Sequence, residues 1–164
     1  AEEGIRGLVR SRGIGDVCER QGLVYDGEFL NAKNHGQGKM TYADGYTYDG
    51  EWANGQRNGM GRAIYADGSI YGGTFTDGQR DGTGKITLPD GFTYQGAWTG
   101  GEISGQGTAT YANGDIYEGT FVRGRRQGVG TMRYTTGEEA TGDWVDGTLP
   151  VAEVAPVAAS ADDN

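Results

Sequence analysis

Few side chains in this chain could act as nucleophiles or bases, and their positions match no catalytic arrangement. His35 is the only histidine, whereas serine hydrolysis requires a histidine held between a serine and an acid. Ser11, Ser69 and Ser104 share no nucleophile-elbow motif. We therefore expect a protein that is not an enzyme, with His35 in a surface loop. An unrecognised hydrolase is the catalytic alternative.

Residues that could hold a metal or a cofactor are equally sparse. Cys18 is the single cysteine, so we expect no metal site and no internal disulfide, and we interpret it as a buried thiol rather than a reactive or intermolecular one. A Gly-x-Gly pattern recurs, but the lysine and serine or threonine of a phosphate-binding loop do not follow it. The recurring Asp-Gly steps lack the alternating acids of a calcium loop. We expect no metal and no cofactor.

The pattern that remains is a repeat of 23 residues, which must position every side chain considered above. Its most regular part is Tyr-x-Gly-x-aromatic, followed by Gly-x-Gly and then by Asp-Gly or Asn-Gly. The tyrosines are Tyr25, Tyr48, Tyr71, Tyr94 and Tyr117, and the closing aromatics are Phe29, Trp52, Phe75, Trp98 and Phe121. A fixed period of this length is typical of a linear array whose units bury their apolar side against their neighbours.

Each repeat is predicted to be one antiparallel β-hairpin. In Tyr48-Asp49-Gly50-Glu51-Trp52 the aromatic residues alternate with acids, which is the period of a strand with one apolar face. The Asp-Gly steps predict tight turns in which both residues adopt positive φ. The stretch from Asn54 to Gly61 predicts a longer glycine-rich loop. The fold class is therefore all-β: an elongated, twisted single antiparallel sheet of consecutive hairpins, an open array with about five full repeats and degenerate end copies.

A glycine stands at the centre of each forward strand, between the tyrosine and the closing aromatic. A glycine inside a strand marks a bend or a close approach. We expect it to let the neighbouring ring lie across the backbone and to curve the sheet towards its aromatic side. These glycines are Gly27, Gly50, Gly73, Gly96, Gly119 and Gly142.

The ends of the chain depart from the repeat and set the predicted domain boundaries. Residues 1–12 are a lead-in, residues 13–147 are the array, and residues 148–164 are a flexible acidic tail. The segment 13–24 resembles half a copy, and Ala140 replaces the tyrosine of the last copy. Degenerate terminal copies cap an open array.

Composition limits the classes of partner. The formal net charge is -9, which opposes binding to nucleic acid and to anionic membrane surfaces. No apolar run is long enough to span a bilayer. We expect a soluble protein; a cytoplasmic location is favoured, and export with a removed signal is the alternative.

The repeat closely resembles the MORN (membrane occupation and recognition nexus) repeat. The resemblance rests on Tyr48-Asp-Gly-Glu-Trp52, Asn54-Gly55, Gly59-Met-Gly61 and Tyr65-Ala-Asp-Gly68, and it covers residues 13–147. It implies an elongated, twisted sheet of hairpins that serves as a scaffold for proteins, peptides or self-association, with lipid binding as a weaker association. Leu88-Pro89-Asp90-Gly91 and Gly72 depart from the pattern.

Two surfaces could bind a partner. Because one sheet layer cannot bury both ends of every ring, we expect the aromatic face to bind a protein or peptide, or a second copy of the chain in a homodimer, although the rings could also serve only to pack on one another. The candidate contacts are Tyr48, Trp52, Tyr71, Phe75, Tyr94, Trp98, Tyr117 and Phe121.

The alternative is peripheral binding of anionic phospholipid by a basic margin near the long loops. Its candidate residues are Arg57, Arg80, Arg125 and Arg126. A margin of acids at the short turns faces it across the ribbon, at Asp44, Asp67 and Asp90. A solvated surface is the simpler interpretation of both margins.

Overall fold

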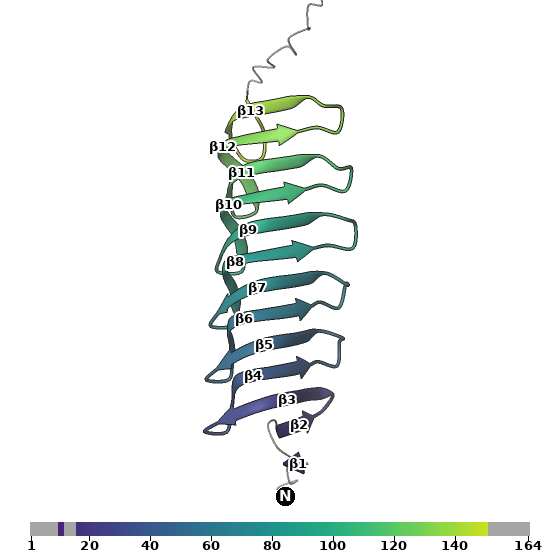
Figure 1. The fold of residues 1–164 in the computed structure, drawn as a ribbon, viewed down its shortest axis with the longest axis vertical. Helices are drawn as coiled ribbons and strands as arrows, with labels where there is room; N and C mark the ends of the chain where they lie inside the picture. The colour runs from purple at the N-terminus through teal and green to yellow at the C-terminus, as the bar shows by residue number, and fades with distance from the viewer. Residues whose placement is uncertain (1–9, 12–15, 151–164) are drawn as a thin grey trace, which may run out of the picture.

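The computed structural model describes residues 10–11 and 16–150, which form a single antiparallel sheet. Its thirteen strands pair in chain order, each with the next, so hairpins stack along the long axis of the molecule (Figure 1). The predicted all-β array of hairpins is confirmed. The strands are β1 (Arg10–Ser11), β2 (Asp16–Arg20), β3 (Leu23–Leu30), β4 (Lys33–Thr41), β5 (Thr47–Ala53), β6 (Gln56–Ile64), β7 (Ile70–Thr76), β8 (Gln79–Thr87), β9 (Thr93–Thr99), β10 (Glu102–Thr110), β11 (Ile116–Val122), β12 (Arg125–Arg133) and β13 (Glu139–Trp144).

The connection predicted as a long glycine-rich loop is a tight turn instead. Asn54 and Gly55 have φ of 52° and 83°, as a two-residue type I′ turn requires, and β6 resumes at Gln56. Asp77–Gly78 and Asp146–Gly147 form equivalent turns. The predicted loop is therefore wrong, because Gly59 and Gly61, which suggested it, lie within β6.

The connections predicted as tight Asp-Gly turns, such as the one at Asp67-Gly68, are the longer ones. Tyr65 N–H donates to Ser69 O at 2.9 Å and Gly68 N–H donates to Tyr65 O at 2.9 Å. Only the glycine has positive φ, at 89°, so the connection is a type I turn closed by a left-handed glycine. Asp67 accepts a hydrogen bond from Ser69 N–H at 2.8 Å instead. The predicted positive φ of the acid is wrong, because the acid acts through its side chain.

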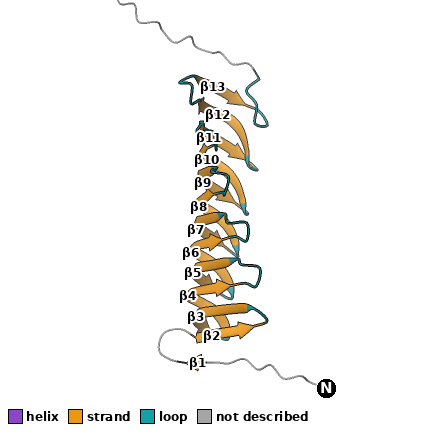
Figure 2. Cartoon of the chain, turned by 90° about the vertical axis from the view of Figure 1, so that its right-hand side faces the viewer, coloured by secondary structure: helices purple, strands orange, loops and turns teal. Residues whose placement is uncertain are grey.

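Each hairpin bends in its middle, so the sheet forms a trough. Gly50 pairs with Gly61 and Trp52 pairs with Arg57, with a register shift between the two pairs. β6 therefore has extra residues at this point, a bulge that bends the strand. Figure 2 shows the strands curving rather than lying flat.

A contact across the trough shows how strong the bend is. Arg57, beside the turn that follows β5, donates to the hydroxyl of Tyr46, beside the turn that precedes β5. If β5 were flat, these two turns would be separated by roughly 20 Å, which is much more than an arginine side chain spans. The two halves of every hairpin therefore face each other across the aromatic residues.

The core between the two halves consists of rings packed on glycines. A Cβ atom on Gly61 would lie 2.5 Å from ring carbons of Tyr48, so only glycine admits the ring here. The Tyr48 hydroxyl donates to Glu51 O at 2.9 Å. The Tyr48 ring also packs edge-to-face on Trp52 at 5.1 Å and on Phe75, of the next repeat, at 5.0 Å. The prediction that these rings lie across the backbone is confirmed.

The described part of the array extends beyond its predicted boundaries at both ends. β1 pairs with β2 through residues assigned to the lead-in. At the other end Leu149 packs on the core, and its side chain covers Gly142, where Ala140 supplies no tyrosine ring. Leu149 thus caps the array and does not belong to the tail. The predictions for residues 1–9, 12–15 and 151–164, and for the Cys18 side chain, lie outside the described residues.

Candidate partner-binding groove

The eight aromatic residues predicted as partner contacts form the core of the trough. None has more than 5% of its surface exposed, which corrects the expectation that this face is open. The expectation assumed one flat layer, whereas the bulges fold the sheet over its own aromatic face and provide two layers. In the folded state these rings hold the hairpins together and leave almost no surface for a partner.

The arginines predicted to form a basic margin point into the trough instead. The Arg80 guanidinium lies 4.5 Å from the Trp98 ring centroid and donates to Gly101 O, of the next turn, at 2.8 Å. Arg57 and Arg126 make the same pair of contacts one repeat before and two repeats after. These three side chains therefore bridge repeats. Only Arg125 among the four predicted arginines is exposed, where it lies 3.6 Å from Asp146.

His35 also has a different place from the one predicted. It lies in β4, not in a surface loop, and it is half-buried. Its backbone carbonyl accepts a hydrogen bond from the Tyr25 hydroxyl at 3.4 Å. The observed role of this position is thus a backbone contact to the first tyrosine of the array.

The opening of the trough, which we call the mouth, is bordered on one side by a row of partly exposed aromatic rings and one leucine. We call this row the aromatic lip. Tyr46 lies 5.3 Å from Tyr65, and Phe92 lies 5.6 Å from Tyr111. The lip was missed as a site, although its tyrosines recur with the same 23-residue period. The lip consists of Tyr42, Tyr46, Tyr65, Leu88, Phe92, Tyr111 and Tyr134.

Opposite the lip, the row of bridging arginines is interrupted once. Ile103 occupies the frame position of Arg80 and Arg126, and Leu88 occupies the lip position that is tyrosine in the neighbouring repeats. No guanidinium spans the mouth at this repeat, and a hollow of about 270 Å³ remains. Its lining is Arg80, Ile86, Leu88, Phe92, Trp98, Gly101, Glu102, Ile103, Arg123 and Gly124.

A second hollow of about 630 Å³ adjoins the first along the mouth, and Phe92 borders both. Its acids are Asp90 and Asp115. The Asp115 carboxylate accepts hydrogen bonds from Thr135 N–H and from the Asn113 amide, which lower the pKa of this carboxyl below its usual value. Asp115 is therefore negatively charged at neutral pH. The lining is Asp90, Phe92, Tyr111, Ala112, Asn113, Asp115, Arg126, Met132, Tyr134 and Trp144.

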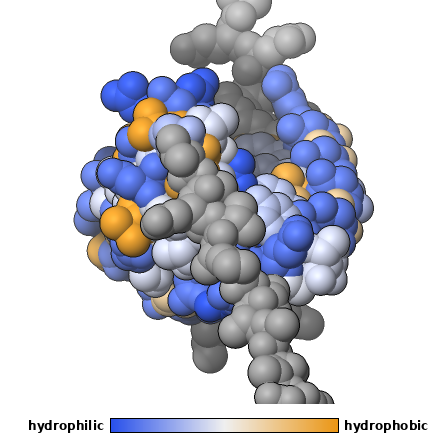
Figure 3. Space-filling model, turned by 90° about the horizontal axis from the view of Figure 1, so that it is seen from above, coloured by the Kyte–Doolittle hydropathy of each residue, from blue (hydrophilic) through white to orange (hydrophobic). Residues whose placement is uncertain are grey.

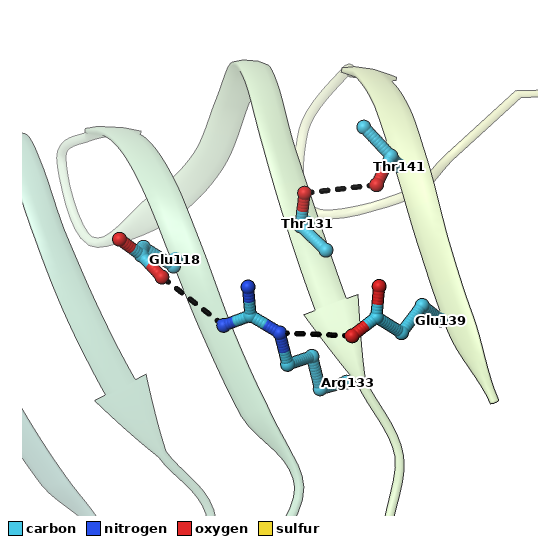
Figure 4. Close-up of polar contacts among 5 residues, drawn as sticks. All are labelled: Glu118, Thr131, Arg133, Glu139 and Thr141. Atoms are coloured by element: carbon cyan, nitrogen blue, oxygen red, sulfur yellow. Dashed lines mark hydrogen bonds and ion pairs between the residues drawn. The ribbon is translucent and has the colours of Figure 1, made fainter. Parts of the chain in front are cut away.

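The outer face of the sheet is mainly polar. Arg133 bridges Glu118 on one neighbouring strand and Glu139 on the other, at 3.1 and 3.0 Å, and the Thr131 and Thr141 hydroxyls lie 2.8 Å apart (Figure 4). These groups are exposed, so their ion pairs contribute little to stability. Seen from above in Figure 3, hydrophilic colours also cover most of the described surface.

A third hollow, of about 690 Å³, lies on this outer face where Gly72 supplies no side chain. Lys85, Gln95 and Thr108 are among the residues that line it. It lacks the aromatic lining of the mouth. The mouth is therefore the better candidate for a partner site.

Among the residues that the structure describes, no group of three histidine, cysteine, aspartate or glutamate side chains is placed to hold a metal ion. Within the same residues, no helix has the length and apolar character needed to cross a membrane.

Comparison with solved structures identifies similar sheets. One is the TCP domain of Drosophila melanogaster SAS-4, in complex with a proline-rich motif of Ana2, with a TM-score of 0.51 and 16% identity over 83% of this chain and 76% of that one. Another is the TCP10 domain of Danio rerio CPAP with a peptide of STIL, with a TM-score of 0.49 and 12% identity over 77% and 58% of the two chains. At these identities the likeness concerns the fold alone.

Sequence comparison gives the family. No curated protein matches the sequence. The family model described as MORN repeat matches five consecutive segments, residues 25–45, 48–70, 71–93, 94–116 and 117–139. These segments cover most of the chain and coincide with the hairpins described above. The chain belongs to the MORN repeat family.

Proposed function

We propose that this protein is a non-catalytic scaffold that binds an extended peptide segment of a protein partner along the mouth of its trough. The observation that carries the proposal is the pair of adjoining hollows beside the aromatic lip. Partly exposed aromatic rings beside a few polar groups are typical of binding sites. Rigid rings also lose little conformational entropy when a ligand covers them.

The spacing of the mouth suits an extended ligand. Strands lie ~4.8 Å apart, so equivalent lip positions recur about every 10 Å, and an extended chain covers that distance with about three residues. The Drosophila SAS-4 domain, whose fold is similar, was solved with a proline-rich motif. It supports the idea that such a sheet can hold a peptide.

The two other functions weighed from the sequence fit the described surface less well. Lipid binding required a free basic margin, whereas three of its four arginines are engaged inside the trough. A homodimer through the aromatic face required exposed rings that are buried. A second copy could still insert a segment into the mouth, and light scattering during the experiment below would reveal it.

The experiment is a selection of random dodecapeptides on the wild-type protein, followed by titration of the selected peptides. The lip variant Tyr134→Ser changes a residue that is 38% exposed, and the control Val129→Ser changes an outer-face residue that is 72% exposed. We expect the lip variant to weaken binding at least about tenfold, which corresponds to about 1.4 kcal/mol. Circular dichroism confirms that both variants fold. Failure to select any peptide, or equal binding by both variants, would overturn the proposal.

A further inference from the structure

One repeat of the mouth differs from its neighbours at two facing positions at once. Arg80 lies 5.8 Å from the Tyr65 ring centroid, and Arg126 lies the same distance from Tyr111, so an arginine and a tyrosine meet across the mouth in these repeats. Between them the corresponding residues are Ile103 and Leu88. The cation and its aromatic partner are both replaced by aliphatic side chains. The mouth is therefore open at this repeat, with an apolar side formed by Leu88, Phe92 and Ile103, and with Arg80, Glu102 and Arg123 also lining the hollow.

We infer that this opening is the anchor pocket for one large apolar side chain of the peptide, and that the adjoining hollow takes a lysine or arginine side chain. The inference rests on the proposed function and specifies the class of peptide. The anchor would pack among Leu88, Phe92 and Ile103, where about 270 Å³ is empty. The cation would lie beside Asp90 and Asp115.

Charge complementarity favours a cationic residue in the second hollow. Asp90 and Asp115 both line it, and the hydrogen bonds to Asp115 stabilise its charged form. The cation already present, Arg126, is engaged with the wall: it lies 4.4 Å from the Trp144 ring centroid and donates one hydrogen bond to Gly147 O. A net charge of -9 also attracts a basic segment during encounter.

The geometry fixes the spacing of the two peptide residues. The pockets lie on consecutive repeats and share Phe92, so their separation is about one repeat, or ~10 Å. An extended peptide covers this distance with about three residues. The partner segment should therefore carry a large apolar residue and a lysine or arginine about three positions apart. The repeat sets this spacing whichever way the peptide runs, so the apolar residue can precede or follow the lysine or arginine.

The test uses peptides selected from the dodecapeptide library on the full wild-type chain. Leu88→Tyr with Ile103→Arg restores the pattern of the neighbouring repeats, so this variant should fold while its pocket closes. We expect it to weaken binding at least about tenfold. Asp90→Asn with Asp115→Asn keeps the side-chain shapes and removes two charges, so we expect about a tenfold loss that disappears at high salt. The control Val129→Arg lies on the outer face and should bind as the wild type does.

The outcomes separate the inference from the proposed function. If no peptide is selected, the proposed function fails and the inference fails with it. If peptides bind and Tyr134→Ser weakens them, but the double variant L88Y/I103R binds equally well, the groove stands and the anchor pocket is wrong. Selected peptides that are acidic, or that lack a large apolar residue at a constant distance from a cation, would also overturn the inference.

Discussion

At the scale of the residue, the central feature is a tyrosine ring that lies on a pair of glycines from adjacent strands. Tyr71 lies over Gly73 and Gly84, which pair directly. Its hydroxyl reaches the carbonyl of Thr74 at 3.0 Å, so the ring crosses the strand and its polar end is satisfied. The glycines are thus the reason that a large side chain can be fully buried in a sheet that has no separate second layer. The two positions Gly72 and Gly73 allow this to be tested.

Alanine at Gly73 should destabilise the protein, and alanine at Gly72 should not. A Cβ at Gly73 would lie 2.5 Å from Thr83 O and 2.7 Å from the Tyr71 hydroxyl, whereas a Cβ at Gly72 would meet nothing within 4 Å. We expect Gly73→Ala to lower the free energy of unfolding by about 1–3 kcal/mol or more. Gly72→Ala should change it little or raise it by about 0.4–1 kcal/mol, since it restricts the unfolded chain. Urea unfolding measures both, and equal losses would contradict the ring-on-glycine account.

The buried tyrosines also predict how stability depends on alkaline pH. Burial raises the pKa of Tyr71 and of Tyr94 from 10.0 to about 12. Above pH 10 the unfolded chain loses these protons while the folded chain retains them, so the unfolded state binds fewer protons and stability falls as pH rises. Their contribution is complete below pH 10 and is lost between pH 10 and about 12.

Urea midpoints measured across this pH range, together with tyrosinate absorbance of the folded protein, check the prediction. A midpoint that stays constant to pH 12 would contradict it. So would titration of these hydroxyls near pH 10 in the folded protein.

At the scale of the element, the hairpin and its period were predictable, but its bend was not. The alternation of aromatic and acidic residues around Tyr48 predicts the strand, and the 23-residue period predicts that consecutive hairpins pair with one another. The two kinds of turn are the reverse of those predicted, because Asn54-Gly55 and Asp67-Gly68 have similar local sequences. What distinguishes them is the register of the strands that they join. The extra residues of β6 opposite β5 appear only when the strands are paired. Since that bulge folds the sheet, burial of the rings and the position of the mouth could not be predicted from local pattern.

The bridging arginines test this bent hairpin directly. Arg80 joins its repeat to the next through the Trp98 ring and the Gly101 carbonyl, and it faces Tyr65 across the mouth. Arg80→Met retains most of the apolar stem and removes both interactions, so we expect a loss of about 1–2 kcal/mol in the free energy of unfolding. The exposed Arg62, on β6, is the matched control, and Arg62→Met should stay within about 0.5 kcal/mol of wild type. If the two variants are equally stable in urea, Arg80 makes no stabilising contact and belongs to the solvated margin that the sequence predicts.

At the scale of the whole molecule, the array is one-dimensional. Each described strand pairs only with its neighbours in the chain, so stability is a sum of hairpins and the interfaces between them. The groove has no such uniformity. The lip tyrosine recurs in the neighbouring repeats but is replaced at Leu88. The facing row of Arg57, Arg80 and Arg126 is interrupted at Ile103 in the same repeat. In the proposed function, the regular repeats support the groove and the departure at Leu88 and Ile103 selects the ligand.

Removal of whole repeats separates these two contributions. Deletion of residues 48–70 or of residues 94–116 removes one matched segment and rejoins the chain in the same frame, so we expect both variants to fold. Each should be about 10 Å shorter by small-angle scattering and less stable in urea, because one interface is lost. Only the second deletion removes Ile103 and places Arg126 opposite Leu88. Selected peptides should therefore still bind the first variant and should bind the second at least about tenfold more weakly.

A deletion of residues 48–69 is the control for frame. It leaves one residue too many for the repeat, which exchanges the two faces of the following strand, so this variant should not form the regular sheet. If it folds as well as the in-frame deletions, the 23-residue register does not govern the fold. If both in-frame deletions bind peptide equally, binding follows from the repeated lip alone, and the interruption at Ile103 has no part in selecting the partner.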